Sequence, residues 1–255
     1  MSGAAAPGRE EFTVRITVKR TACLLALALL LCAPARPQSR RRGGHKPTAR
    51  PSAAGDFIAS SLDGPNDGEI NGRVYANKFF GLRLTFPEGW FVLSEAGKQA
   101  VMESGKTRMK PLSPQEQKMF EQSIDRTYNL LTVGQYFVAP PGKSSATLMC
   151  MAEVLPVLNL TSRQYMTFMK ENVLPRSTIK YEVVGDIAEE KIAGEEFTLL
   201  KLKLDTPVGA MSQEYHVTIR RGFALGFILT YGTEEQYNFL SEVLKSVALD
   251  RRAAK

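Results

Sequence analysis

The sequence predicts an α+β protein in which an antiparallel β-sheet packs between α-helices. In GLRLTF (81–86), apolar and polar residues alternate with the period of a half-buried strand. Between residues 181 and 231, four extended segments follow one another through short connections, which favours antiparallel neighbours. From residue 233 to 247, apolar residues recur at helical spacing, so the domain is expected to end on an amphipathic helix.

The N-terminal segment 1–35 has the pattern of a secretory signal peptide. Basic residues precede the apolar run TACLLALALLLCA, which is shorter than the roughly 20 residues a membrane-spanning helix needs. Ala33-Pro34-Ala35 supplies a small-x-small site, so we expect cleavage after Ala35 and a secreted or periplasmic protein. Two alternatives remain: lipidation at Cys32, or an uncleaved membrane anchor formed by residues 21–35.

Residues 36–69 are rich in Pro, Gly, Ser and Arg and have little apolar periodicity. Such a segment buries too little surface to offset its ordering entropy, which predicts a disordered tether. The cluster Arg40-Arg41-Arg42 could touch an anionic membrane or polymer surface, or be part of a solvated spacer. Residues 70–250 are expected to form a single α+β domain.

The net charge of +7 does not indicate a nucleic-acid partner. Residues 1–69 hold 10 basic and 6 acidic residues, so more than half of the excess lies outside the predicted domain. No basic patch interleaved with aromatic residues accompanies the remaining charge.

The first half of the domain alternates between strand and helix signals. After GLRLTF, Pro87-Glu88-Gly89 predicts a turn, and Ser94 can cap a helix that Pro111 stops. Ser113 to Glu116 reads as a capping box that opens a second helix. The segments YNLLTVGQYF (128–137) and ATLMCMAEVL (146–155) are expected to be strands joined by a turn-rich loop.

The second half is expected to add a helix, four strands and a last helix. Thr161 to Gln164 repeats the capping-box pattern. The strand FALGFILTY (223–231) is apolar on both faces, which predicts a central position in the sheet with cover on both sides. Thr233 is expected to cap the final helix.

This order of elements resembles the PsbP-like superfamily, which also contains the Ran-binding Mog proteins. The resemblance rests on Phe80-Gly81-Leu82, on the turn Pro87-Glu88-Gly89-Trp90, and on an apolar strand followed by an amphipathic helix. It covers roughly residues 73–249 and implies a binding or accessory domain rather than an enzyme. Partners differ between branches of the superfamily, so the resemblance implies none for this chain.

We expect no catalytic, cofactor-binding or metal-binding residues. Two histidines occur, His45 in the tether and His216 on the polar face of its strand, where we expect it to be solvated. Cys150 falls on an apolar face and should be a buried structural thiol. Gly142-Lys143-Ser144 lacks the first glycine of a phosphate-binding loop and is expected to be a turn.

The sequence therefore favours an exported, non-enzymatic binding or accessory module whose partner is a protein or another envelope component. A hypothetical partner surface comprises Trp90, Lys201, Lys203 and Arg220. Two alternatives stay open. One is an exported hydrolase with an unrecognised site, which would need a deep pocket with convergent polar groups. The other is a membrane-anchored envelope factor.

Overall fold

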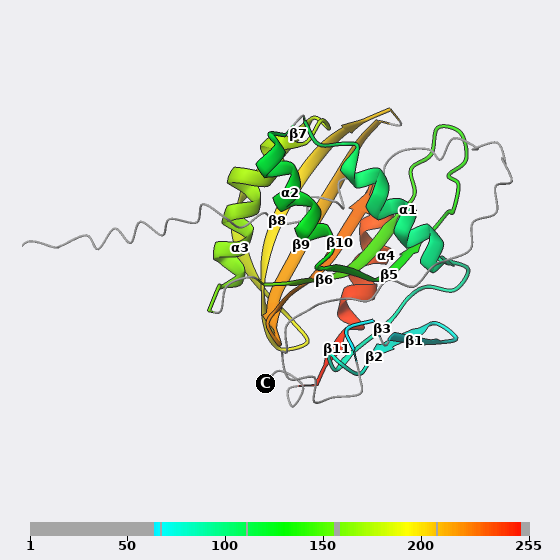
Figure 1. Ribbon diagram of the computed structural model, residues 1–255. Helices are drawn as coiled ribbons and strands as arrows, with labels where there is room; N and C mark the ends of the chain where they lie inside the picture. The colour runs from blue at the N-terminus through cyan, green and yellow to red at the C-terminus, as the bar shows by residue number, and fades with distance from the viewer. Residues whose placement is uncertain (1–63, 67, 111, 156–158, 208, 251–255) are drawn as a thin grey trace, which may run out of the picture.

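The computed structural model describes residues 64–250, except residues 67, 111, 156–158 and 208. The predicted signal peptide with its cleavage site at Ala35, the cluster Arg40–Arg42 and most of the predicted tether lie outside the described residues. The part that is described forms an α+β structure with two antiparallel sheets and several helices, as Figure 1 shows.

A seven-stranded antiparallel sheet forms the centre of the molecule, with the order β4-β5-β6-β10-β9-β8-β7. Its strands are β4 (Phe91–Val92), β5 (Thr127–Gly134), β6 (Thr147–Val154), β7 (Tyr181–Ile192), β8 (Glu195–Thr206), β9 (Gly209–Arg220) and β10 (Phe223–Tyr231). The prediction that FALGFILTY is the central strand is confirmed, because β10 lies between β6 and β9 and most of its residues are buried.

A second, four-stranded sheet lies at one end of the molecule (Figure 1). Its order is β1 (Gly68–Asn71), β2 (Val74–Asn77), β3 (Leu82–Thr85) and β11 (Ala248–Leu249). The alternating segment GLRLTF provides β3, whose partner β11 comes from the end of the domain. The sequence did not separate this sheet from the large one, because the pairing of β3 with β11 is not visible in local periodicity.

The helices begin where their capping residues predict. They are α1 (Glu95–Lys106), α2 (Pro114–Ile124), α3 (Ser162–Phe168), which continues into a π-turn (Met169–Val173) and a 3-10 turn (Leu174–Arg176), and α4 (Glu234–Lys245). The capping boxes at Ser113 and Thr161 both form, and the Thr233 side chain accepts from the backbone N–H of Gln236. Local sequence therefore sets the start of each helix.

The two faces of the large sheet pack against different elements (Figure 1). On one face, Met149 and Met151 of β6 pack against α3 and the turns that follow it. On the other face, Phe227 of β10 packs with Leu240 of α4 and with residues of the small sheet. Cover on both faces explains why β10 is apolar along its whole length.

Candidate functional site

A pocket lined by several charged and polar side chains lies between α4 and strands β7, β8 and β9. We call it the α4 pocket; its volume is about 250 Å³. Glu190, Lys201, Glu214 and His216 line it from the strands, and Tyr237 is among the residues that line it from α4. Acidic, basic and aromatic side chains therefore converge on one small cavity.

Strand geometry brings these groups together. Glu214 and His216 are two residues apart on β9, so both side chains point to the same face of the sheet. On β8, Lys201 lies opposite Glu214, and Leu199 lies opposite His216. Glu190 belongs to the edge strand β7 and contacts His216 from beyond β8.

Glu214 lies at the centre of the polar contacts in the pocket. Its Oε1 accepts a hydrogen bond from Tyr231 Oη at 2.8 Å and lies 2.9 Å from Lys201 Nζ. Its Oε2 lies 3.4 Å from Nε2 of His216, and Nδ1 of His216 contacts the Glu190 carboxylate. Two carboxylates therefore face two nitrogens of one imidazole, and a lysine supplies the other positive charge.

These contacts change the pKa values of the buried groups. Burial alone would lower the pKa of His216, but hydrogen bonds to Glu190 and Glu214 outweigh it and raise that pKa above its ordinary value of 6.5. Burial alone would raise the pKa of Glu214, but hydrogen bonds from His216, Lys201 and Tyr231 outweigh it and lower that pKa to about 2. The charged forms are thus favoured on both sides of the contact.

The expectation that His216 is a solvated surface histidine is wrong, because the residue is only 2% exposed. Alternation along β9 correctly assigned it to a polar face together with Glu214. That face is covered by α4, which comes from a later part of the chain. Sequence periodicity can separate the two faces of a strand, but it does not say which face a distant helix covers.

The α4 pocket has the converging polar groups that a hydrolase would need, yet its geometry indicates an ion network. Both nitrogens of His216 lie next to carboxylates, and the ring is only 2% exposed, so the imidazole is buried within the network rather than presented to a substrate. Among the described residues, no group of three or more His, Cys, Asp or Glu side chains could hold a metal ion.

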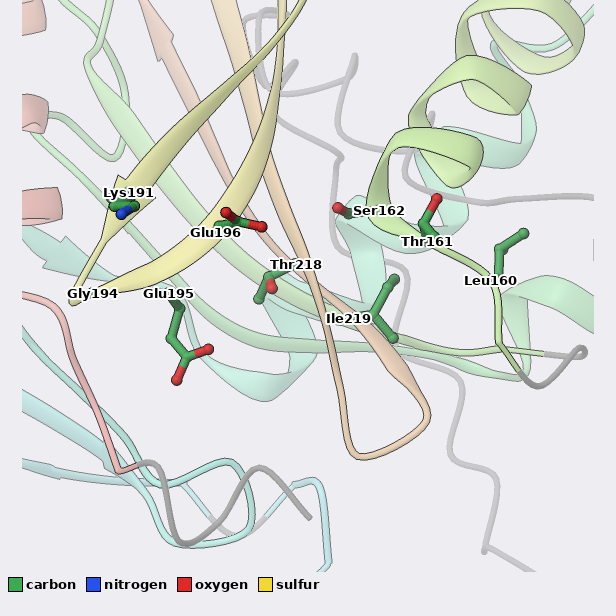
Figure 2. A pocket seen from close by; sticks show the side chains of 9 residues that line it. All are labelled: Leu160, Thr161, Ser162, Lys191, Gly194, Glu195, Glu196, Thr218 and Ile219. Atoms are coloured by element: carbon green, nitrogen blue, oxygen red, sulfur yellow. The ribbon is translucent and has the colours of Figure 1, made fainter.

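A second, shallower pocket of about 490 Å³ lies beside the tip of the β7–β8 hairpin. Figure 2 shows its lining: Thr161 and Ser162 at the start of α3, Glu195 and Glu196 at the hairpin, and Thr218 on β9. Ser162 Oγ accepts a hydrogen bond of 2.7 Å from Thr198 Oγ1, which ties the start of α3 to β8. The polar groups of this pocket thus also join α3 to β8.

The residues of the hypothetical partner surface do not come together. Arg220 is only 3% exposed, so the expectation that it contributes to a surface is wrong. Its Nε donates to the carbonyl of Phe80 at 2.8 Å, and Nη2 donates to the carbonyl of Asp250. The cause is the small sheet, whose strands bring these carbonyls to the end of β9.

The other three members of that surface lie near opposite edges of the large sheet. Lys203 is exposed and Lys201 is half-buried, both on β8. Trp90 immediately precedes β4 and packs, partly buried, against the core. Five strand spacings separate β4 from β8, a distance of about 24 Å, so these side chains do not form one continuous patch.

An apolar surface that the sequence did not predict lies at the loop between β5 and β6. Phe137 is 71% exposed and Val138 is 63% exposed. We call these two side chains the apolar tip; the ring of Phe137 lies edge-to-face with Phe91 of β4 at 5.6 Å. The sequence predicts that Phe137 ends a strand, but β5 ends at Gly134, so alternation does not determine the burial of Phe137.

Hydrogen bonds hold the base of this loop. Gln135 N donates to Ala146 O at 2.8 Å, and Tyr136 N donates to Ser145 Oγ at 3.0 Å. The Gln236 side chain, on α4, bonds to Ser144 O at 2.9 Å and to the side chain of Gln135 at 3.2 Å. The apolar tip is therefore presented on a loop that is anchored to both the sheet and α4.

Two further sequence predictions are confirmed. Cys150 is fully buried in the core, and burial raises the pKa of its thiol, which keeps it protonated and unreactive. Gly142-Lys143-Ser144 belongs to a turn, in which Lys143 N donates to Pro140 O at 3.0 Å. Neither segment therefore has the features of a reactive or phosphate-binding site.

Comparisons with known proteins concern the fold. No family model and no curated protein matches the chain. In the described residues, no helix is long and apolar enough to cross a membrane. Among solved structures, cyanobacterial PsbP (CyanoP) from Synechocystis matches with a TM-score of 0.40 and 13% identity, covering 77% of this chain and 98% of that one.

Two other solved structures match with somewhat lower TM-scores. LpqN of Mycobacterium tuberculosis, described as involved in cell envelope biogenesis, matches with a TM-score of 0.36 and 12% identity over 66% of this chain and 82% of that one. The Ran-binding protein Mog1p of Saccharomyces cerevisiae matches with a TM-score of 0.36 and 8% identity over 73% of this chain and 100% of that one. PsbP and Mog proteins, the two groups that the sequence resembles, are thus both among the structural neighbours, and the likeness is one of fold.

Proposed function

We propose that this protein is an exported, non-enzymatic binding or accessory module that docks onto a protein of the cell envelope through its apolar tip. The observation that carries the proposal is the exposure of Phe137 and Val138 on an anchored loop. Neighbouring large apolar side chains that are exposed to solvent often mark interaction sites. The N-terminal pattern supports export, with a tether between the cleaved end and the domain that is shorter than the predicted 36–69, because β1 already begins at Gly68.

The anchoring of the loop favours binding in a preformed conformation. Hydrogen bonds at its base reduce the conformational entropy that a partner would have to remove. Burial of a Phe or Val side chain contributes roughly 1.5–3 kcal/mol. The two side chains can therefore serve as a binding hot spot, although neither contributes to the core of the domain.

Site-specific photo-crosslinking in the producing cells tests the proposal. The full-length chain carries a benzophenone amino acid at position 137 or, as a matched control, at position 239. Phe239 is also an exposed phenylalanine, at 40%, but lies on α4. We expect a discrete protein adduct from position 137 and none from position 239. Equal adducts at both positions, or none at position 137, would contradict docking through the apolar tip.

Carbonate extraction of the same cells tests the export part of the proposal separately. A protein that has been cleaved after Ala35 lacks the apolar segment 21–35 and is released into the wash. Retention in the membrane pellet would instead support the alternative in which residues 21–35 anchor the protein. Mass determination of the mature N-terminus would distinguish cleavage after Ala35 from lipidation at Cys32.

A further inference from the structure

We propose that the contact between His216 and Glu190 is a pH-operated clasp: it holds the outer half of the β7–β8 hairpin to the sheet more tightly while His216 is protonated and loosens when His216 is neutral. We define the outer hairpin as residues 188–197. This inference concerns a different part of the molecule from the apolar tip and does not depend on the proposed function.

The outer hairpin is set apart from the rest of the sheet. β7 is an edge strand that pairs with β8 alone. Its register with β8 shifts between Val184 and Ala188, where Gly185 has a positive φ of 70°. Beyond this bulge, the strand continues to the tight turn at Ala193 and Gly194. The outer hairpin is therefore connected through a bulge at which the backbone can pivot.

The clasp spans the sheet from edge to interior. Glu190 lies on β7 and His216 lies on β9, with β8 between them. The His216 side chain is 3% exposed and that of Glu190 is 32% exposed. A charge contact in such surroundings is screened much less by salt than a surface ion pair. It is one of two described ion pairs that bind the outer hairpin to a buried side chain of β9, the other being that between Arg220 and Glu195.

Every element around His216 contributes a group that affects its charge state. Glu190 contacts it from β7 and Glu214 from β9, and Lys201 of β8 and Tyr231 of β10 bond to Glu214. The residues Lys191 on β7 and Tyr237 and Lys245 on α4 also line the pocket. The two carboxylates favour the imidazolium, whereas the lysines oppose it.

Protonation changes what the imidazole can bond. The imidazolium has two N–H donors, one for each carboxylate. The neutral ring has one donor and one lone pair. Because Nε2 has no hydrogen-bond partner in the described part of the chain, the donor stays on Nδ1 beside Glu190 and the lone pair faces Glu214. Glu214 keeps its contacts with Lys201 and Tyr231. Among the described residues, Glu190 has no ion pair other than that with His216, so on deprotonation its contact weakens from an ion pair to a hydrogen bond from a neutral donor.

Other contacts also hold the outer hairpin, because Ile192 and Phe197 are buried in the core and Phe197 stacks on Phe227 of β10. Arg163 bonds to Glu189 at 2.9 Å, but both side chains are more than half exposed. Arg220 lies 3.7 Å from Glu195, at the limit of an ion pair, and its main partners are backbone carbonyls. The backbone ladder with β8 remains, so release means faster local opening rather than unfolding.

The direction of the switch follows from the protonation of His216. Burial lowers the pKa of His216, but the bonds to Glu190 and Glu214 raise it by more, so its pKa in the folded protein lies above 6.5. The clasp is therefore complete below pH 6.5 and is lost as the pH rises through the folded value. An alkaline shift, not an acid one, loosens the hairpin.

Hydrogen exchange of the full chain between pH 6 and 9 tests the proposal, with rates corrected for the intrinsic pH dependence. We expect protection of the outer-hairpin amides to fall about tenfold for each unit by which the pKa of His216 is raised. In Glu190→Gln and His216→Gln, protection should be low at pH 6 and should not change with pH. Glu189→Gln, which removes an exposed ion pair in the same hairpin, should behave as the unsubstituted protein does.

The outcomes separate the clasp from a general loss of stability. If His216→Gln does not fold, Glu190→Gln still decides the matter, because its side chain is at the rim of the pocket. A ring-proton NMR titration in a His45→Gln background reports His216 alone. Constant protection of the outer hairpin across this pH range, or unchanged pH dependence in Glu190→Gln, would overturn the proposal.

Discussion

Nε of Arg220, at the end of β9, donates a 2.8 Å hydrogen bond to the backbone carbonyl of Phe80, 140 residues earlier in the chain. Phe80 precedes β3 of the small sheet, and Arg220 also donates to the carbonyl of Asp250, just after β11. One buried side chain thus joins the large sheet to both chain segments that build the small one.

Arg220→Met should destabilise the protein strongly. The substitution keeps most of the side-chain volume but leaves the carbonyls of Phe80 and Asp250 without their donor, at an expected cost of about 2–4 kcal/mol in the free energy of unfolding. Urea unfolding followed by the fluorescence of Trp90, the only tryptophan, measures it. Lys203→Met on the exposed part of β8 is the control and should change stability by less than about 0.5 kcal/mol.

His216 should make global stability fall on the alkaline side. Its pKa is raised in the folded protein, so its contribution is present below pH 6.5 and is lost as the pH rises through the folded value. We expect the free energy of unfolding to fall by about 1–3 kcal/mol between pH 6 and 9. The same urea titrations on His216→Gln should give a flatter profile over this range, and a parallel profile would refute the role of His216.

Glu214 should make the free energy of unfolding fall at acid pH. Its pKa is lowered from 4.5 to about 2, so its contribution is present above pH 4.5 and is lost as the pH falls toward 2. Glu214→Gln should cost about 2–4 kcal/mol at pH 6, because Lys201 and His216 lose a buried counter-charge. The difference between the two proteins should shrink below pH 4.5, which acid-dependent unfolding curves measure. A difference that is constant with pH would assign the effect to shape rather than charge.

Gln236→Ala should release the loop that carries the apolar tip. The Gln236 side chain accepts from Gly232 N at 2.8 Å and Ser144 Oγ at 3.0 Å, and it donates to Ser144 O at 2.9 Å. We expect a loss of about 1–3 kcal/mol and faster hydrogen exchange in residues 135–146. Glu235→Ala, on the exposed side of the same helical turn, is the control and should leave exchange in that loop unchanged.

Cys150 should be unreactive until the protein unfolds. The thiol is fully buried and its pKa is raised by burial, so little thiolate is available at neutral pH. A chromogenic disulfide reagent applied to the Cys23→Ser/Cys32→Ser chain should give no signal in buffer and one thiol in urea. Rapid labelling of the native protein would contradict the position of Cys150 in the core.

By itself, the sequence determined the local elements and the central strand. Ser113, Thr161 and Thr233 cap helices, and β10 is buried on both faces, because capping and periodicity act over a few residues. Gln236 illustrates the limit. Its backbone N–H bonds to Thr233 as expected, yet its side chain bonds to Gly232 N and to the β5–β6 loop.

Only the tertiary structure decided which polar and apolar side chains are exposed to solvent. His216 and Arg220 lie on a polar face that α4 and the small sheet cover, whereas Phe137 lies beyond the end of β5 and is exposed. Alternation assigns a side chain to one face of a strand, but burial depends on segments that arrive from far along the chain. The ion network and the apolar tip are products of that assembly, and no local pattern of residues encodes them.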